Sequence, residues 1–226
     1  MDFKSVGLMG HSGGGHHLLR LQSNMLADAS PPRDTYISHV KGIVFSHANK
    51  DFFEEAGKPK ATWIPGKTDN TPGPTQAVPA MFVTSTDDQD VVYHGKVYRA
   101  YEYNLQNYTA SGGTGTYNTV FVSTQGKHQA PLTPAADGGA AEFDVWTGRF
   151  LYCHLVDPTG TRKEETCDRI YDGSTDNICK ATWTDGGTKK PLLEHLCADT
   201  KDWKASAYEC GGGTTVGPKC ETKPKH

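Results

Sequence analysis

The pentapeptide Gly-His-Ser-Gly-Gly at residues 10–14 constrains the fold of this chain more than any other feature. It has the G-x-S-x-G form of a nucleophile elbow, a tight turn that presents a serine between a strand and a helix. The apolar run over residues 6–9 predicts a short buried strand before the turn. After the turn, Leu18, Leu21 and Met25 recur at steps of three and four and predict one face of a helix.

A serine in such a turn can act as a nucleophile, because its hydroxyl stands clear of the backbone where a base can reach it. The residues two before and two after Ser12 must be small, and Gly10 and Gly14 meet this requirement. The backbone amide of Gly13 follows the serine and can donate to a developing oxyanion at a helix N-terminus. We therefore predict Ser12 as nucleophile and Gly13 as oxyanion donor. A chance match remains the alternative in a chain with 25 glycines.

In a fold with this elbow, an acid and then a histidine should follow the serine along the chain. An apolar segment at residues 78–85 leads into a turn with aspartates at 87, 88 and 90, of which we select Asp88 as the acid. The alternative interpretations are a solvated acidic turn or a calcium site formed with Asp87 and Asp90.

The predicted base is His128. It follows the strand-like segment 119–124 and a loop that contains glycine, whereas most of the ten histidines are expected at the surface. His128 would take the Ser12 proton, and Asp88 would fix the tautomer of His128 and stabilise the imidazolium.

These residues resemble the α/β-hydrolase superfamily, and within it the secreted polyesterases, cutinases and dienelactone-hydrolase-like enzymes, including bacterial polyethylene terephthalate hydrolases. The resemblance covers roughly residues 4–155 and rests on four segments: Gly10-His11-Ser12-Gly13-Gly14, Val78-Pro79 leading to Asp88, Gly126-Lys127-His128, and residues 143–150. The family implies an acid three residues after a small residue and three before a valine, and Ser85 and Val91 bracket Asp88 in this way. The last segment looks like the family's final helix with its aromatic face under the sheet. Phe143, Trp146, Phe150 and Cys153 fall at helical steps, which an ordinary core helix explains as well.

The resemblance also implies an incomplete fold, because family members place several strands before the elbow. We expect a partial α/β-hydrolase fold, in which the strands near 5–10, 40–46, 79–85 and 119–124 form one parallel half-sheet with flanking helices. The elbow strand would lie at an edge of this sheet. The N-terminal half, the second oxyanion loop and any secretion leader would be missing. His16 and His17 depart from the family pattern, and residues 49–77 are expected to form an extended loop over the site.

The cysteines define a second region. All six lie after residue 152, in a polar, glycine-rich segment: Cys153, Cys167, Cys179, Cys197, Cys210 and Cys220. An even count in such a segment indicates disulfides and an oxidising compartment, whereas a zinc site would favour cysteine pairs two to four residues apart. We therefore predict a catalytic region at residues 1–156 and a Cys-rich extension at 157–226 with little regular structure.

Composition excludes several classes of function. No run of eighteen apolar residues predicts a membrane span, and a net charge of −3 without a basic stripe argues against nucleic-acid binding. We expect a monomer without cofactor or metal; a metal bound by His11, His16 and His17 is the alternative.

The sequence thus predicts a secreted serine ester hydrolase that acts on a small-molecule or polymeric ester. A serine peptidase or thioesterase on the same fold is one alternative, and a truncated or non-catalytic homologue is another.

Overall fold

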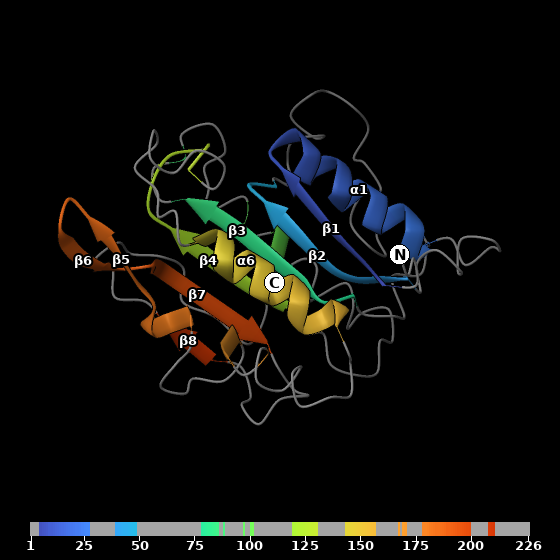
Figure 1. Ribbon diagram of the computed structural model, residues 1–226. Coiled ribbons are helices and arrows are strands. Elements are labelled where there is room, and N and C mark those ends of the chain that lie inside the picture. The colour runs from blue at the N-terminus through green and yellow to red at the C-terminus, as the bar shows by residue number, and fades with distance from the viewer. Residues whose placement is uncertain are drawn as a thin grey trace.

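The structure is a computed structural model, and it describes residues 5–27, 39–48, 78–85, 88, 97, 100–101, 119–130, 143–156, 167, 169–170, 178–199 and 208–210. Within these residues, six strands form one sheet in the order β1-β2-β3-β4-β7-β8, and two more form a small hairpin (Figure 1). The strands are β1 (Val6–His11), β2 (Val40–Ser46), β3 (Ala80–Ser85), β4 (Thr119–Thr124), β5 (Thr182–Asp185), β6 (Thr188–Pro191), β7 (Leu193–Asp199) and β8 (Tyr208–Cys210). The helices are α1 (Gly13–Ala27), α6 (Phe143–Leu155) and the 3-10 turn η1 (Ile178–Lys180).

The first four strands are parallel neighbours in chain order. Their register aligns Phe45 with Phe82 and Phe82 with Phe121, so one row of rings crosses the middle of the sheet. The rings of Phe45 and Phe82 stack with centroids 4.8 Å apart. This confirms the predicted parallel arrangement of these four strands with flanking helices, and β1 is the outermost strand among those described.

Alternate residues of the strands enter two separate cores, as expected for strands covered on both faces. Ile43 and Phe45 of β2 pack on the face that contacts Leu19 of α1. Val44, between them, packs on the opposite face with Phe150 of α6. The two helices therefore lie on opposite faces of the sheet (Figure 1).

Burial in the elbow region differs from the prediction for both the strand β1 and the helix α1. The strand forms as predicted, but it is only partly buried, and Met9 is 48% exposed. The buried side of α1 carries His16 and Leu19, whereas Leu21 of the predicted apolar face is 43% exposed. The prediction of a buried strand was therefore wrong, because β1 has one neighbouring strand among those described and part of its surface stays open.

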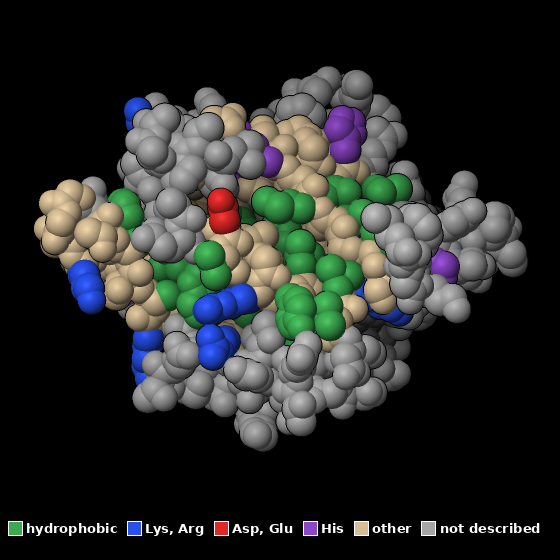
Figure 2. Space-filling model, viewed as in Figure 1, with side chains coloured by type: hydrophobic (Ala, Val, Ile, Leu, Met, Phe, Trp, Pro, Cys, Tyr) green, Lys and Arg blue, Asp and Glu red, His purple; other side chains and the backbone are tan. Residues whose placement is uncertain are grey.

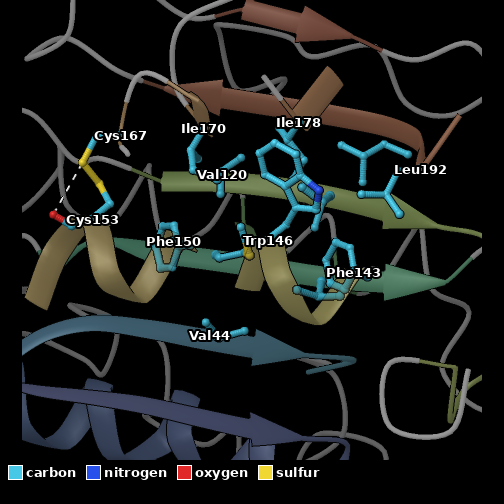
Figure 3. Close-up of a cluster of buried hydrophobic side chains, with 14 of the residues drawn as sticks. Val44, Val120, Phe143, Trp146, Phe150, Cys153, Cys167, Ile170, Ile178 and Leu192 are labelled. Atoms are coloured by element: carbon cyan, nitrogen blue, oxygen red, sulfur yellow. Dashed lines mark hydrogen bonds between the residues drawn. A yellow bond between two sulfur atoms is a disulfide. The ribbon is translucent and has the colours of Figure 1, made fainter. Parts of the chain in front are cut away.

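The predicted helix at residues 143–150, with one buried face, is confirmed in α6. Phe143, Trp146, Phe150 and Cys153 are all buried in the core on that side of the sheet (Figure 3). The outer side of the same helix is different: Val145, Tyr152 and Val156 next to its end are exposed. Figure 2 shows hydrophobic side chains in the middle of the face on which α6 lies.

The C-terminal region contributes to the same sheet and core. β7 pairs antiparallel with β4, β8 pairs antiparallel with β7, and β5 and β6 form the hairpin. A disulfide joins Cys153 of α6 to Cys167, and Ile170, Ile178 and Leu192 complete the core beside it (Figure 3). Trp183 and Leu193 belong to the same core. The expectation of little regular structure after residue 156 was therefore wrong for the described part of that region. Of the cysteines, only the Cys153–Cys167 pair has described side chains.

No helix in the described ranges has both the length and the apolar character needed to cross a membrane.

Candidate active site

The four parallel strands end at the same edge of the sheet, and each is followed by a residue with a reactive side chain. Ser12 follows β1, His47 follows β2, Asp88 lies three residues after the end of β3, and His128 lies four residues after the end of β4. The crevice at the carboxyl ends of parallel strands is the usual ligand site of open α/β sheets. The sheet order thus brings together residues that are far apart in the sequence.

Ser12 stands in a strained turn between β1 and α1. Its φ of 51° lies in the left-handed region, and its backbone N–H donates to the carbonyl oxygen of Ser46 over 2.8 Å. A non-glycine residue held there costs about 1–3 kcal/mol, and such residues cluster at functional sites. The turn has the geometry predicted for an elbow, and the Gly13 amide begins helix α1, where the first N–H groups have no partner within the helix.

The glycines around the elbow have unequal roles. A Cβ on Gly10 would lie 2.5 Å from the carbonyl oxygen of Gly14, and a Cβ on Gly15 would lie 2.9 Å from the carbonyl oxygen of Ser46. A Cβ on Gly14 would meet no atom within 4 Å. The predicted need for a small residue at Gly10 is confirmed, whereas the prediction for Gly14 was wrong, because Gly15 is the residue that approaches the neighbouring strand.

Asp88 and His128 form the buried polar pair of the site. Nδ1 of His128 lies 3.0 Å from Oδ2 of Asp88, and the Asp88 side chain is fully buried, whereas that of His128 is 11% exposed. A carboxylate at this distance favours the tautomer with the proton on Nδ1, which leaves Nε2 with a lone pair. The two neighbouring aspartates, Asp87 and Asp90, lie outside the described residues.

His47 is a residue of the site that the sequence analysis did not identify. It is fully buried, it has a φ of 55°, and its Nε2 lies 2.9 Å from Oγ of Ser85 and 3.7 Å from Oδ2 of Asp88. Its Nδ1 lies 3.0 Å from Oγ of Ser46, and that hydroxyl lies 2.9 Å from Nδ1 of His11. A chain of hydrogen bonds therefore connects the elbow strand to the end of β3.

The rings of His11, His47 and His128 form a triangle in which each pair of centroids is 5.0 Å apart. Burial lowers the pKa of His47 well below its ordinary value, and the nearby His11 and His128 lower it further. Burial and His128 also lower the pKa of His11. Both rings are consequently neutral near pH 7, so they add no positive charge to the site.

A fourth histidine lies behind the elbow. His16 is buried on α1, and burial lowers its pKa to about 4. A metal bound by His11, His16 and His17 was the alternative predicted from the sequence. In the described part of the chain, the side chains whose donor atoms converge are instead His47, Asp88 and His128, which lie within 4.8 Å of one another.

The site thus contains all four residues predicted from the sequence, Ser12, Gly13, Asp88 and His128, at the ends of neighbouring strands. The predicted loop at residues 49–77 lies outside the described residues. The signal that could have revealed His47 is its place directly after an apolar strand, the same signal that identified His128. Comparison of the chain with protein-family models, with curated proteins and with solved structures found no match.

Proposed function

We propose that this protein is a serine hydrolase that cleaves carboxylic esters, with Ser12 as nucleophile, His128 as general base and Asp88 as its orienting acid. The observation that carries the proposal is the buried Asp88–His128 pair at the sheet edge where the strained Ser12 also lies. The ring of His11, the residue before the serine, lies 5.0 Å from that of His128, which supports the same grouping. A strained serine, a histidine and a buried carboxylate are the three parts that such catalysis needs.

The proposed reaction has two halves. Nε2 of His128 removes the proton from Oγ of Ser12 while the oxygen attacks the ester carbonyl, and the same proton is then given to the leaving alcohol. Water attacks the resulting acyl-enzyme with His128 again as base, which releases the acid and restores the serine. Asp88 remains ionised and stabilises the imidazolium, and the Gly13 amide donates to the oxyanion.

The kind of bond and substrate that the protein cleaves is a separate part of the proposal. Serine peptidases and thioesterases use the same three residues, so the preference for small or polymeric esters rests on the resemblance to polyesterases and cutinases. The disulfide between Cys153 and Cys167 supports the proposal of a secreted protein, because disulfides persist in oxidising compartments.

The test compares the wild-type protein with Ser12→Ala in hydrolysis of p-nitrophenyl acetate and butyrate. The exposed Ser5→Ala provides a matched control for the loss of one hydroxyl. We expect Ser12→Ala to abolish hydrolysis above the rate in buffer and Ser5→Ala to retain the wild-type rate. Equal rates for the wild type and folded Ser12→Ala would contradict the proposal. Thioester, peptide and polyester-film substrates then determine the substrate class.

A further inference from the structure

The carboxylate of Asp88 faces two histidines, whereas a catalytic triad needs only one. Its Oδ2 lies 3.0 Å from Nδ1 of His128 on one side and 3.7 Å from Nε2 of His47 on the other. The proposed mechanism uses the first contact and has no role for the second. His47 is nevertheless fully buried at the end of β2, with a positive φ of 55°.

Two imidazole nitrogens and one carboxylate oxygen are a donor set that suits zinc and similar divalent ions. Zinc lies about 2.0–2.2 Å from such donors, so ligands of one ion are separated by about 3–4 Å. The two contacts of Asp88, at 3.0 and 3.7 Å, already fall in this range. All three donor atoms lie within 4.8 Å of one another, so a small ring rotation brings them around one ion.

The surroundings of His47 suit a metal ligand. Nε2 faces Oδ2 of Asp88 and also the hydroxyl of Ser85, 2.9 Å away, a contact that a bound ion would replace. Nδ1 lies 3.0 Å from Oγ of Ser46, which can hold the proton on Nδ1 and direct the Nε2 lone pair towards the ion. Metal-binding histidines usually have such a partner on the second nitrogen. The three protein ligands would leave a fourth position for water, as in open zinc sites.

We propose that His47, Asp88 and His128 bind a divalent transition-metal ion such as zinc, and that bound metal and use of His128 as a base exclude each other. The second part rests on the proposed function. When the ion takes the lone pair of Nδ1 of His128, the ring proton moves from Nδ1 to Nε2. Nε2 then carries a proton and has no lone pair for the proton of Ser12, so the metal-bound protein does not cleave esters.

The binding test uses the full chain, freed of metal with EDTA and dialysed. Cobalt titration followed by visible absorption, and zinc competition against a chromophoric chelator, measure stoichiometry and affinity. We expect the wild type to bind one metal ion per chain tightly, and His47→Gln to bind it at least tenfold more weakly. His17→Gln, which changes an exposed histidine, should bind metal like the wild type. Because His47 is buried, His128→Gln provides a second ligand variant if His47→Gln fails to fold. Equal binding by the wild type and a folded ligand variant, or the absence of a tight site in the wild type, would overturn the proposal.

Two further measurements separate this proposal from the proposed function. Ser12→Ala keeps all three ligands, so it should bind metal like the wild type whether or not the protein is an esterase. In the ester assay, one equivalent of zinc should remove most wild-type hydrolysis and EDTA should restore it, whereas His47→Gln should keep its own zinc-free rate. Faster hydrolysis with zinc, or equal inhibition of His47→Gln, would overturn the mutual exclusion. If Ser12-dependent hydrolysis is absent, the proposed function fails, and the titration alone decides the metal site.

Discussion

Nδ1 of His128 lies 3.0 Å from Oδ2 of Asp88, a residue forty positions earlier in the chain. The two residues meet because β3 and β4 are parallel neighbours, so that the turns after them emerge at the same edge of the sheet. The pair is covered by protein on the Asp88 side and reaches solvent only at the histidine ring. A buried carboxylate beside a histidine acts mainly by holding one tautomer of the imidazole ring.

Asp88→Asn should lower kcat for ester hydrolysis by roughly 10⁴-fold, because an amide no longer selects the tautomer with a free Nε2 lone pair. KM should change much less, since the carboxylate does not contact substrate in the proposed mechanism. Steady-state kinetics on p-nitrophenyl butyrate measures both constants. Asp144→Asn, the same substitution at an exposed position on α6, should keep wild-type kinetics. Equal kcat values in the two variants would remove Asp88 from the mechanism.

Gly10→Ala and Gly15→Ala should each destabilise the fold, by about 1–3 kcal/mol, because the added Cβ would meet backbone oxygen atoms 2.5 and 2.9 Å away. Gly14→Ala is the matched control on the same turn. It has open space and should raise stability by up to about 1 kcal/mol through its greater helix propensity. Urea unfolding followed by circular dichroism compares the three variants. Similar midpoints for Gly10→Ala and Gly14→Ala would contradict the close approach described for Gly10.

Lowering the pH from 7 towards 4 should destabilise the protein. Burial lowers the pKa of His16 from 6.5 to about 4, so between these values the unfolded chain binds a proton at this position that the folded chain excludes. This loss begins as the pH falls through 6.5 and reaches its full extent below about 4. Urea midpoints at several pH values, measured in EDTA, should fall less steeply for His16→Gln than for the wild type. His17→Gln, at an exposed position, should retain the wild-type slope. A wild-type slope in His16→Gln would show that His16 titrates normally.

Replacing Cys153 and Cys167 together by alanine should lower the free energy of unfolding by about 3 kcal/mol, because their disulfide closes a loop with a sequence separation of 14. Reductant should destabilise the wild type more than this double variant, because the variant lacks the bond. Thermal unfolding with and without dithiothreitol checks this. An equal response of both proteins to reductant would mean that this disulfide contributes nothing to stability.

Ile178→Ala should cost about 2–5 kcal/mol, although residue 178 lies in the region expected from sequence to be irregular. Its side chain is fully buried in the core that includes Phe150 and Trp146 of α6. Val145→Ala, at a position that is 53% exposed, should change stability by less than about 0.5 kcal/mol. Equal urea midpoints for these two variants would indicate that residue 178 does not pack in the core.

The sequence was sufficient for the four parallel strands and for the nearness of Asp88 to His128, because both follow from local patterns. Each strand is an apolar run, each site residue comes shortly after one, and parallel strands end at one edge. His47 carries the same signal, because it directly follows the apolar strand β2, but its contact with Asp88 depends on a distance across the sheet that no local pattern encodes. The second small residue of the elbow was predicted at Gly14, one position too early. The residue that needs to be small is Gly15, because its backbone lies close to Ser46 on the neighbouring strand β2.

The C-terminal strands were missed for a related physical reason. The hairpin of β5 and β6 is short and mostly polar, and its buried anchor, Trp183, is isolated in the sequence. β7 is held by its pairing with β4, a contact between distant parts of the chain that no local pattern encodes. Regular structure there depends on an already formed sheet edge.

β4 carries the turn with His128, and it is paired on one side with β3 and on the other with β7. The turn that carries His128 is therefore held by two strands, one from the region that supplies Ser12 and Asp88 and one from the cysteine-rich region. In the proposed mechanism, substitutions in β7 would alter the position of His128, and so the rate of hydrolysis, without touching a substrate. For redesign of this protein, β7 is therefore a position outside the site from which the proposed activity could be altered.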